Sequence, residues 1–223
     1  MRFAFIFDRN SGSFFCLKFM AKHHDSTDGK IFKRVSGNGR GWVFTPSQFL
    51  DLGSRYAVDL ALMRYASKGI FRKLTRGLYD YPKSHPKLGR LSPAIDTIAT
   101  ALKGRDSIKL QPSGAYAANL LGLSEQVPMK VVFLTDGATK KVQIHRQSIE
   151  LKHTTPRNMA TAGRVSGLVI QALRYLGAAA IDDQIIKQLR QRLGAAEQAV
   201  LLKDLAYAPA WIAKVIRKIT GGK

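Results

Sequence analysis

The strongest constraint on the fold is a regular succession of periodic stretches and breaks between residues 30 and 82. An apolar spacing typical of a short helix ends at the glycine-rich residues 37–41, and a β-type run at 42–44 follows. Thr45 precedes a proline and lies three residues before a glutamine, a pattern typical of a helix start with a capping box. We therefore expect a helix, a short strand and a second helix, in this order.

A third helix is expected from Arg55 to about Lys68, with Ser54 as its N-cap. Apolar side chains recur at helical spacing on one face, which predicts the side that packs on the core. Leu60 and Met63 fall on the opposite, outward face, where polar side chains are the rule. Contacts with thymine methyl groups, with the second domain or with a partner would each explain them.

Two β-type runs flank Arg76 and Gly77 and predict a β-hairpin, because glycine readily adopts the positive φ of a tight turn. A helix, a short strand, two helices and a hairpin are the elements of a winged helix-turn-helix, in which the hairpin is the wing. We expect the run at 42–44 to pair with this wing. Residues 20–82 should form this DNA-binding domain.

The rest of the chain is expected to form a mixed α/β domain at 93–223, which ends in helices and makes the whole protein α+β. The stretch 82–93 carries three prolines and no periodicity, which predicts a linker at 83–92. Residues 1–19 are expected to be a spurious leader or a flexible arm, because the polar stretch from Met20 reads like a natural N-terminus. In the second domain, strands are expected near 131–134, 141–144 and 147–151, and helices near 95–102, 113–121, 161–176, 182–193, 195–206 and 209–219.

The charge balance indicates a polyanionic partner. Lysine and arginine number 36 against 15 acidic residues, which gives a net charge of +21. The excess is +9 over residues 20–90 and +10 over the much longer stretch 91–223, so the winged domain is the more basic per residue. Nucleic acid is the first expectation and an anionic membrane surface the second. No apolar run approaches the roughly 18 residues of a membrane span.

The candidate DNA contacts lie on the third helix and on the hairpin that follows it. In a winged helix-turn-helix these elements meet the major groove and the flanking backbone or minor groove. Ser54 and the first amides of the helix can bind a phosphate, and the residues just after Ser54 would face base edges. The residues predicted to contact DNA on these grounds are Ser54, Arg55, Tyr56, Arg64, Lys68, Arg72, Lys73 and Arg76.

Nothing in the motifs favours an enzyme, and we expect no catalytic, cofactor-binding or metal-binding residues. The five histidines lack zinc-binding spacing, and the glycine-rich residues 37–41 lack the strand-to-helix context of a nucleotide-binding loop. The adjacent carboxylates of Asp182 and Asp183 fit a helix start. A single cysteine, Cys16, excludes a disulfide framework and fits a reducing compartment such as the bacterial cytoplasm.

Two blocks of the sequence resemble the AbiEi-type antitoxins, the antitoxin halves of bacterial type IV toxin–antitoxin modules. The first block is GWVFTPSQFLDLGSRYAVDLALMRYASKGIFRKLTRGLYDYPKSHPKLGRLSP, and the second is PSGAYAANLLGLSEQVPMKVVFLTDG. The similarity runs from about Lys30 to Leu176, two-thirds of the chain. Its most specific parts are RGLYDYP, NLLGLSEQVP and VFLTDG in this order.

The resemblance implies a winged helix-turn-helix that represses the promoter of its own module, with two copies of the chain on an inverted repeat. It adds Thr45 to the expected DNA contacts. It also implies a C-terminal domain that neutralises a nucleotidyltransferase-like toxin in an abortive-infection defence against phage. The basic C-terminal helices are the expected surface for the toxin, with no single residue assigned. A stand-alone transcriptional regulator and an RNA-binding protein, both without a toxin partner, are the alternatives.

Overall fold

A computed structural model describes residues 26–104, 108–144 and 146–221 of the chain. The protein is α+β, with 51% helix and 18% strand, as expected. Its contacts divide it into two compact units near residue 105, and each unit is described by itself. Residues 1–19, predicted as a leader or arm, lie outside the described residues.

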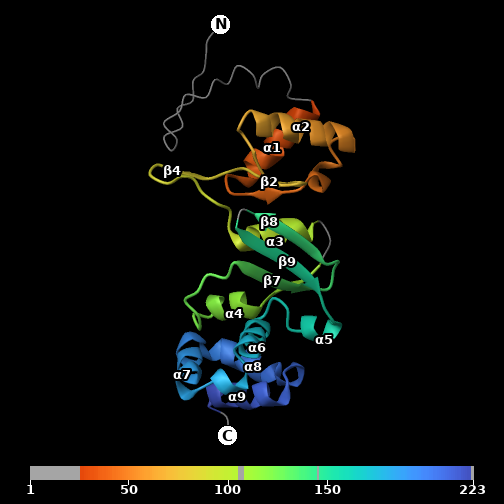
Figure 1. The fold of residues 1–223 in the computed structure, drawn as a ribbon. Coiled ribbons are helices and arrows are strands. Elements are labelled where there is room, and N and C mark those ends of the chain that lie inside the picture. The colour runs from red at the N-terminus through yellow and green to blue at the C-terminus, as the bar shows by residue number, and fades with distance from the viewer. Residues whose placement is uncertain (1–25, 105–107, 145, 222–223) are drawn as a thin grey trace. The chain divides into compact units, whose positions relative to one another are not determined.

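The first unit begins with the predicted winged helix-turn-helix (Figure 1). Its sheet is antiparallel in the order β1-β3-β2, so the short strand pairs with the wing as expected. Gly77 has φ +72° at the turn of the wing, which confirms the need for glycine there. The elements are α1 (Thr27–Asn38), β1 (Val43–Phe44), the 3-10 turn η2 (Pro46–Phe49), α2 (Arg55–Ser67), β2 (Arg72–Thr75) and β3 (Leu78–Asp80).

Aromatic rings form much of the core that joins α1, α2 and the small sheet. The Phe44 ring packs edge-on against Phe49 and Phe71, with centroids 5.5 and 5.3 Å apart. Helix α2 buries Val58 and Leu62 on its predicted inward face, and this burial fixes the rotation of the helix about its own axis. The opposite face of α2 is thereby directed to solvent.

Three expectations for the first unit are wrong. The segment after Thr45 is a single 3-10 turn, and the Thr45 hydroxyl bonds Ser47 Oγ at 2.8 Å, so it forms no capping box. Residues 83–92, predicted as a linker, form an antiparallel hairpin of β4 (Ser84–His85) and β5 (Gly89–Arg90). The next helix, α3 (Ile95–Lys103), was expected in the second domain but is grouped with the first unit, where it packs against β1.

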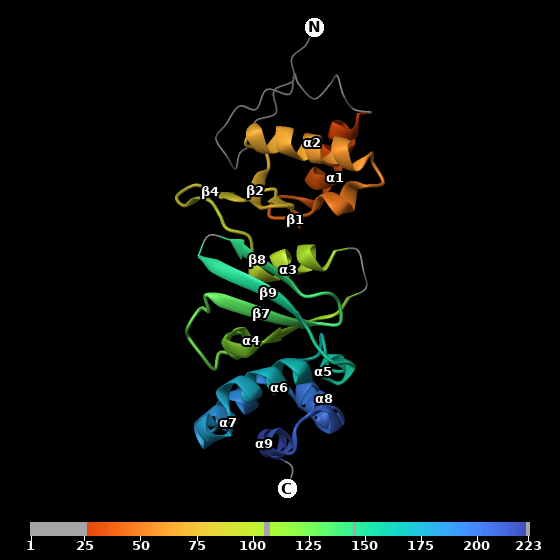
Figure 2. The same ribbon diagram turned by 45° about the vertical axis from the view of Figure 1, so that its right-hand side comes forward.

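The second unit contains a four-stranded mixed sheet in the order β6-β7-β9-β8 (Figure 2). The central strands β7 and β9 are parallel, and β6 and β8 are antiparallel edges. The sequence predicted three of the four strands but missed β6, which contains Pro112, and it did not predict the order. The strands are β6 (Leu110–Ser113), β7 (Lys130–Thr135), β8 (Lys140–Ile144) and β9 (Gln147–His153).

Helices complete the second unit, and the C-terminal ones follow the predicted positions closely. Helix α6 packs against α4 and β6, and it shares an apolar core with α7, α8 and α9. Gly167 of α6 allows this approach, because a Cβ there would meet the Thr161 carbonyl oxygen and the Gln111 side chain. The helical elements are α4 (Gly114–Leu120), α5 (Pro156–Met159), α6 (Val165–Leu176), η3 (Ala178–Ala180), α7 (Asp183–Arg192), α8 (Ala195–Lys203), η4 (Leu205–Tyr207) and α9 (Ala210–Thr220).

None of the helices in the described part of the chain has the length and apolar character needed to cross a membrane.

Candidate nucleic-acid interface

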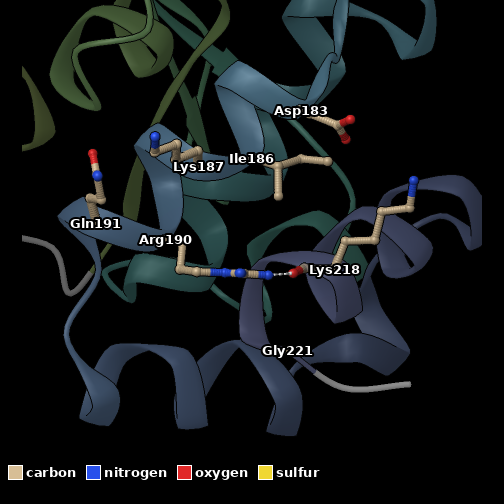
Figure 3. Close-up of a pocket in the computed structure, with 7 residues that line it drawn as sticks. All are labelled: Asp183, Ile186, Lys187, Arg190, Gln191, Lys218 and Gly221. Atoms are coloured by element: carbon tan, nitrogen blue, oxygen red, sulfur yellow. Dashed lines mark hydrogen bonds between the residues drawn. The ribbon is translucent and has the colours of Figure 1, made fainter.

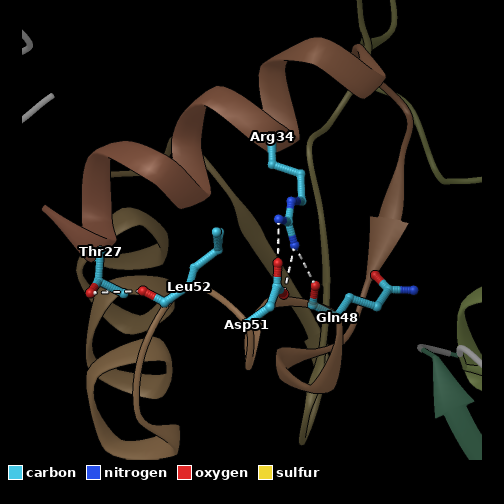
Figure 4. Close-up of polar contacts among 5 residues, drawn as sticks. All are labelled: Thr27, Arg34, Gln48, Asp51 and Leu52. Carbon is cyan, nitrogen blue, oxygen red and sulfur yellow. Dashed lines mark hydrogen bonds and ion pairs between the residues drawn. The ribbon is translucent and has the colours of Figure 1, made fainter. Parts of the chain in front are cut away.

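The turn that leads into α2 is fixed by polar contacts from α1 (Figure 4). The Arg34 guanidinium forms two hydrogen bonds with the Asp51 carboxylate, at 2.9 and 2.6 Å, and a third with the carbonyl oxygen of Gln48 at 2.8 Å. The carboxylate raises the pKa of Arg34, so this guanidinium stays charged. Thr27 Oγ1 donates to the Leu52 carbonyl oxygen at 3.3 Å. These contacts set the position at which α2 begins.

The N-terminus of α2 is capped and carries a cation. Ser54 is the N-cap, as predicted, and its hydroxyl accepts a hydrogen bond from the amide of Ala57 at 3.3 Å. The first turn contains no carboxylate and carries Arg55 and Tyr56, whose exposed fractions are large. The unpaired amides and the dipole at a helix N-terminus attract a phosphate, and an adjacent cation strengthens the attraction.

Arg55 forms an ion pair with Asp59, one turn further along α2, at 2.8 Å. The side chains of Arg55 and Asp59 remain 61% and 48% exposed, and an ion pair in such a position contributes at most about 1 kcal/mol to stability. Loss of this ion pair therefore costs the protein little stability. The ion pair orients the Arg55 side chain but leaves most of it accessible to solvent.

The wing lies beside this end of α2. Tyr79 of β3 is buried, and burial raises its pKa; the charge of Asp59 raises that pKa further, whereas Arg55 lowers it. Tyr79 also belongs to the same apolar core as Val58, which lies in the first turn of α2. The start of α2 and the central strand of the wing sheet are therefore parts of one packed structure.

The cations of the wing fall into two groups. Lys73 and Arg76 are exposed, and the wing from residue 72 to 78 contains no acidic residue. Arg72 instead forms a bidentate ion pair with the buried Asp80, with bonds of 3.0 and 2.6 Å, and donates a further bond to the carbonyl oxygen of Leu91. Arg72 thus stabilises the wing, and Lys73 and Arg76 are the cations that the wing presents to solvent.

The second half of α2 is directed towards α1. Arg64 forms an ion pair with Asp28 at 3.3 Å, and the Tyr65 hydroxyl donates to the carbonyl oxygen of the same residue. Lys68 is the exposed C-cap of the helix. Of the residues predicted to contact DNA, Ser54, Arg55 and Tyr56 lie together at the N-terminus of α2, whereas Arg64 and Lys68 lie along its length and at its far end.

The outward face of α2 carries apolar side chains, as expected. Met63 is 58% exposed and Tyr56 is 77% exposed, and Leu60 is half-buried between them. The helix is consequently apolar on both faces, with arginines at the edge of the outer one.

The sequence did not predict the cations of the β4–β5 hairpin. Lys83 and Lys87 are exposed on it, and the Arg40 guanidinium lies 4.8 Å above the ring of Tyr81, next to the start of the hairpin. Gly89, with φ +68°, is the residue that permits its turn. The strands are only two residues each, too short to produce a recognisable alternation of polar and apolar positions.

In the second unit, an open groove of about 730 Å³ lies between α7 and α9 (Figure 3). Arg190 closes one side, because its guanidinium donates to the carbonyl oxygens of Lys218 and Ile219 at the end of α9. The groove carries several cations, but its lining has no nucleophile beside a base. The lining residues are Asp183, Ile186, Lys187, Arg190, Gln191, Lys218 and Gly221.

Among the residues that the structure describes, no group of three or more histidine, cysteine, aspartate and glutamate side chains is arranged to hold a metal ion. The most deeply buried carboxylates are structural: Asp80 pairs with Arg72, and Asp204 pairs with Arg164 and accepts a bond from Ser166.

The fold and this surface define a two-unit α+β protein that begins with a winged helix-turn-helix. Residues 30–201 match a family of unknown function, DUF6088, and the chain belongs to this family. A search of curated proteins finds no match. Among solved structures, the chain is similar to the crystal structure of the RV2827C protein from Mycobacterium tuberculosis, with 13% identity, a TM-score of 0.48, and coverage of 88% of this chain and 78% of that one.

Proposed function

We propose that this protein binds DNA in a sequence-specific manner, represses its own promoter and acts as the antitoxin of a type IV toxin–antitoxin module. One observation carries the DNA-binding part. The N-terminus of α2, free of carboxylates in its first turn and bearing exposed Arg55 and Tyr56, shares its apolar core with a wing that presents Lys73 and Arg76.

This arrangement suits duplex DNA for two physical reasons. A capped helix N-terminus with arginine and tyrosine can enter a major groove, where arginine forms bidentate bonds with guanine and apolar side chains contact thymine methyl groups. Exposed lysine and arginine on the wing neutralise flanking phosphates and release counterions. The net charge of +9 over residues 20–90 favours association with any polyanion, so the placement of these side chains supplies the specificity.

The antitoxin part of the proposal rests on the resemblance of the sequence to the AbiEi-type antitoxins. The partner would be a nucleotidyltransferase-like toxin in the bacterial cytoplasm. The basic helices of the second unit are the surface proposed to receive it, because α7 and α9 carry exposed cations such as Lys187, Arg217 and Lys218. No role is assigned to a single residue there.

DNA binding is tested by gel shifts with the DNA directly upstream of the gene and with a random duplex of equal length. We expect Arg55→Ala to weaken operator binding by about 1–3 kcal/mol and to relax specificity, and Lys73→Ala to weaken binding to both duplexes about equally. Asp59→Ala is the matched control, because it breaks the same ion pair without removing a cation.

If Arg55 acts on DNA, Asp59→Ala should bind at least as tightly as the wild type. Equal losses in the two variants would mean that the ion pair matters only for folding. Wild-type binding of Arg55→Ala and Lys73→Ala would place the DNA-binding surface elsewhere.

The antitoxin role is tested in cells. A nucleotidyltransferase-like reading frame adjacent to the gene, expressed alone, should arrest growth, and co-expression of this protein should restore it. The same rescue by a variant with Arg55→Ala and Lys73→Ala would assign neutralisation to a different surface from DNA binding. Failure of the wild-type protein to rescue growth would favour a stand-alone regulator.

A further inference from the structure

The β4–β5 hairpin is a projecting arm without a core of its own. Each residue from Lys83 to Arg90 is exposed, so neither face of its two strands is covered by protein. In both ribbon views it extends away from α1 and α2 as a narrow loop (Figures 1 and 2). An isolated two-stranded hairpin is marginally stable in water, and this one buries no side chain to compensate.

The base of the arm is nevertheless firmly attached to the winged domain. Arg90 donates to the carbonyl oxygen of Gly69, the residue just beyond the C-cap of α2, at 3.0 Å. The Leu91 amide bonds the Lys83 carbonyl oxygen at 2.8 Å, and Arg72 of the wing donates to the Leu91 carbonyl oxygen at 2.7 Å. The arm is thus positioned by the far end of α2 and by the first strand of the wing, while its tip is free of protein contacts that would bury it.

The amino-acid composition of the arm indicates the chemical class of its binding partner. Between Tyr81 and Asp96 the chain contains no acidic residue, and the tip consists of Pro86, Lys87 and Leu88. Leu88 is 73% exposed, an unusual position for leucine at the end of a polar hairpin. Cations flanking an exposed apolar side chain are typical of arms that enter the minor groove, where the cations contact phosphates and the apolar side chain wedges against the bases.

We propose that the β4–β5 hairpin is a second DNA-contacting arm, which reaches the minor groove or backbone next to the segment bound by α2 and the wing. Lys87 contacts phosphate and Leu88 contacts the groove. This inference rests on the proposed DNA-binding function, and it adds a site outside the helix and wing. It also predicts that the protein covers a longer stretch of DNA than a helix and a single wing would.

The test compares two substitutions at the tip that should act differently. Binding of full-length Lys87→Ala, Leu88→Ala and wild-type protein to the upstream duplex is measured between about 50 and 200 mM salt. Lys87→Ala should lose one phosphate contact, so the negative slope of log K against log salt should become shallower by about 0.9. Leu88→Ala should weaken binding at all salt concentrations without changing the slope, because no charge is removed.

Lys152→Ala, which removes an exposed lysine from β9 of the second unit, is the control and should leave both the affinity and the slope unchanged. Hydroxyl-radical footprinting, which reports on the minor-groove edge, should lose protection only at the flank of the site in Leu88→Ala. Both substitutions lie at an exposed tip, so far-ultraviolet circular dichroism of each variant should match that of the wild type.

Wild-type affinity and slope in both tip variants, with binding lost in Arg55→Ala, would overturn the arm and leave the proposed function standing. A lower molar mass of Leu88→Ala in sedimentation, without a change in DNA affinity, would overturn it too and would make the arm a contact between copies of the chain. Absence of DNA binding by the wild-type protein would remove the proposed function itself.

Discussion

Replacement of Arg72 by methionine should lower the stability of the winged domain more than replacement of any other cation predicted to bind DNA. Asp80 is 1% exposed, and Arg72 supplies both of its charge-assisted hydrogen bonds, at 3.0 and 2.6 Å. Without the guanidinium, a carboxylate remains buried and unpaired. Removal of one partner from a buried ion pair costs about 3–5 kcal/mol.

The loss should fall near the lower end of that range, about 3 kcal/mol, because the Arg72 side chain is 21% exposed and water already reaches part of it. With a urea m-value of about 2 kcal/mol/M, the midpoint of unfolding would decrease by about 1.5 M. The assay is urea unfolding followed by the fluorescence of Trp42, which packs on the core of the first unit. A Trp211→Phe background removes the only other tryptophan and isolates this signal.

The matched control is Arg55→Met, which breaks an exposed ion pair of the same kind and should cost at most about 1 kcal/mol. In the double variant Arg72→Met with Asp80→Asn, part of the loss should be recovered, because the amide carries no charge to bury. Equal, small midpoint shifts for Arg72→Met and Arg55→Met would refute the assignment of Arg72 to the wing. That result would mean that Arg72 is as available to contact DNA as Arg55.

Gly167→Ala should destabilise the second unit by about 1–3 kcal/mol, because its Cβ would overlap the backbone oxygen of Thr161; unfolding followed by the tryptophan of that unit tests this. Ser54→Ala should cost about 1 kcal/mol of urea stability through loss of the N-cap, and no loss would contradict the capping bond. Burial raises the pKa of Tyr65 and Tyr79 above 10.0, so their contribution to stability is constant below pH 10 and declines as pH rises through the raised values. Alkaline urea titrations should show this decline in the wild type and a smaller one in each tyrosine-to-phenylalanine variant.

The sequence predicted the elements of the winged domain, apart from the helix expected after Thr45, because each depends on a local signal. Apolar spacing marks the buried face of α2, Ser54 marks its start, and Gly77 marks the turn of the wing. The helices from α6 to α9 were predicted for the same reason. Each shows apolar residues at helical spacing, and glycine or proline marks the breaks between them. Ser54 and the exposed Tyr56 were thereby placed correctly at the N-terminus of α2.

Features that depend on contacts between distant segments were not predictable. Strand β6 contains Pro112, which argues against a strand on local grounds, yet an edge strand accepts it. The β6-β7-β9-β8 order places β8 against β9 although the chain leads to β8 directly from β7.

The ion pair between Arg72 and Asp80 could not be predicted either. The two residues face each other only once strands β2 and β3 have paired. The sequence therefore predicted Arg72 as a DNA contact, whereas its guanidinium is bound to the buried Asp80 carboxylate. The β4–β5 hairpin was missed because proline and the absence of periodicity usually indicate a loop.

Footprinting on the DNA directly upstream of the gene tests the central claim most directly. The account predicts protection of an inverted repeat, with half-sites separated by a whole number of helical turns, and loss of that protection when Arg55 and Lys73 are both replaced by alanine. Equal binding of the wild-type protein to the upstream DNA and to a random duplex, with no protected segment, would contradict sequence-specific DNA binding.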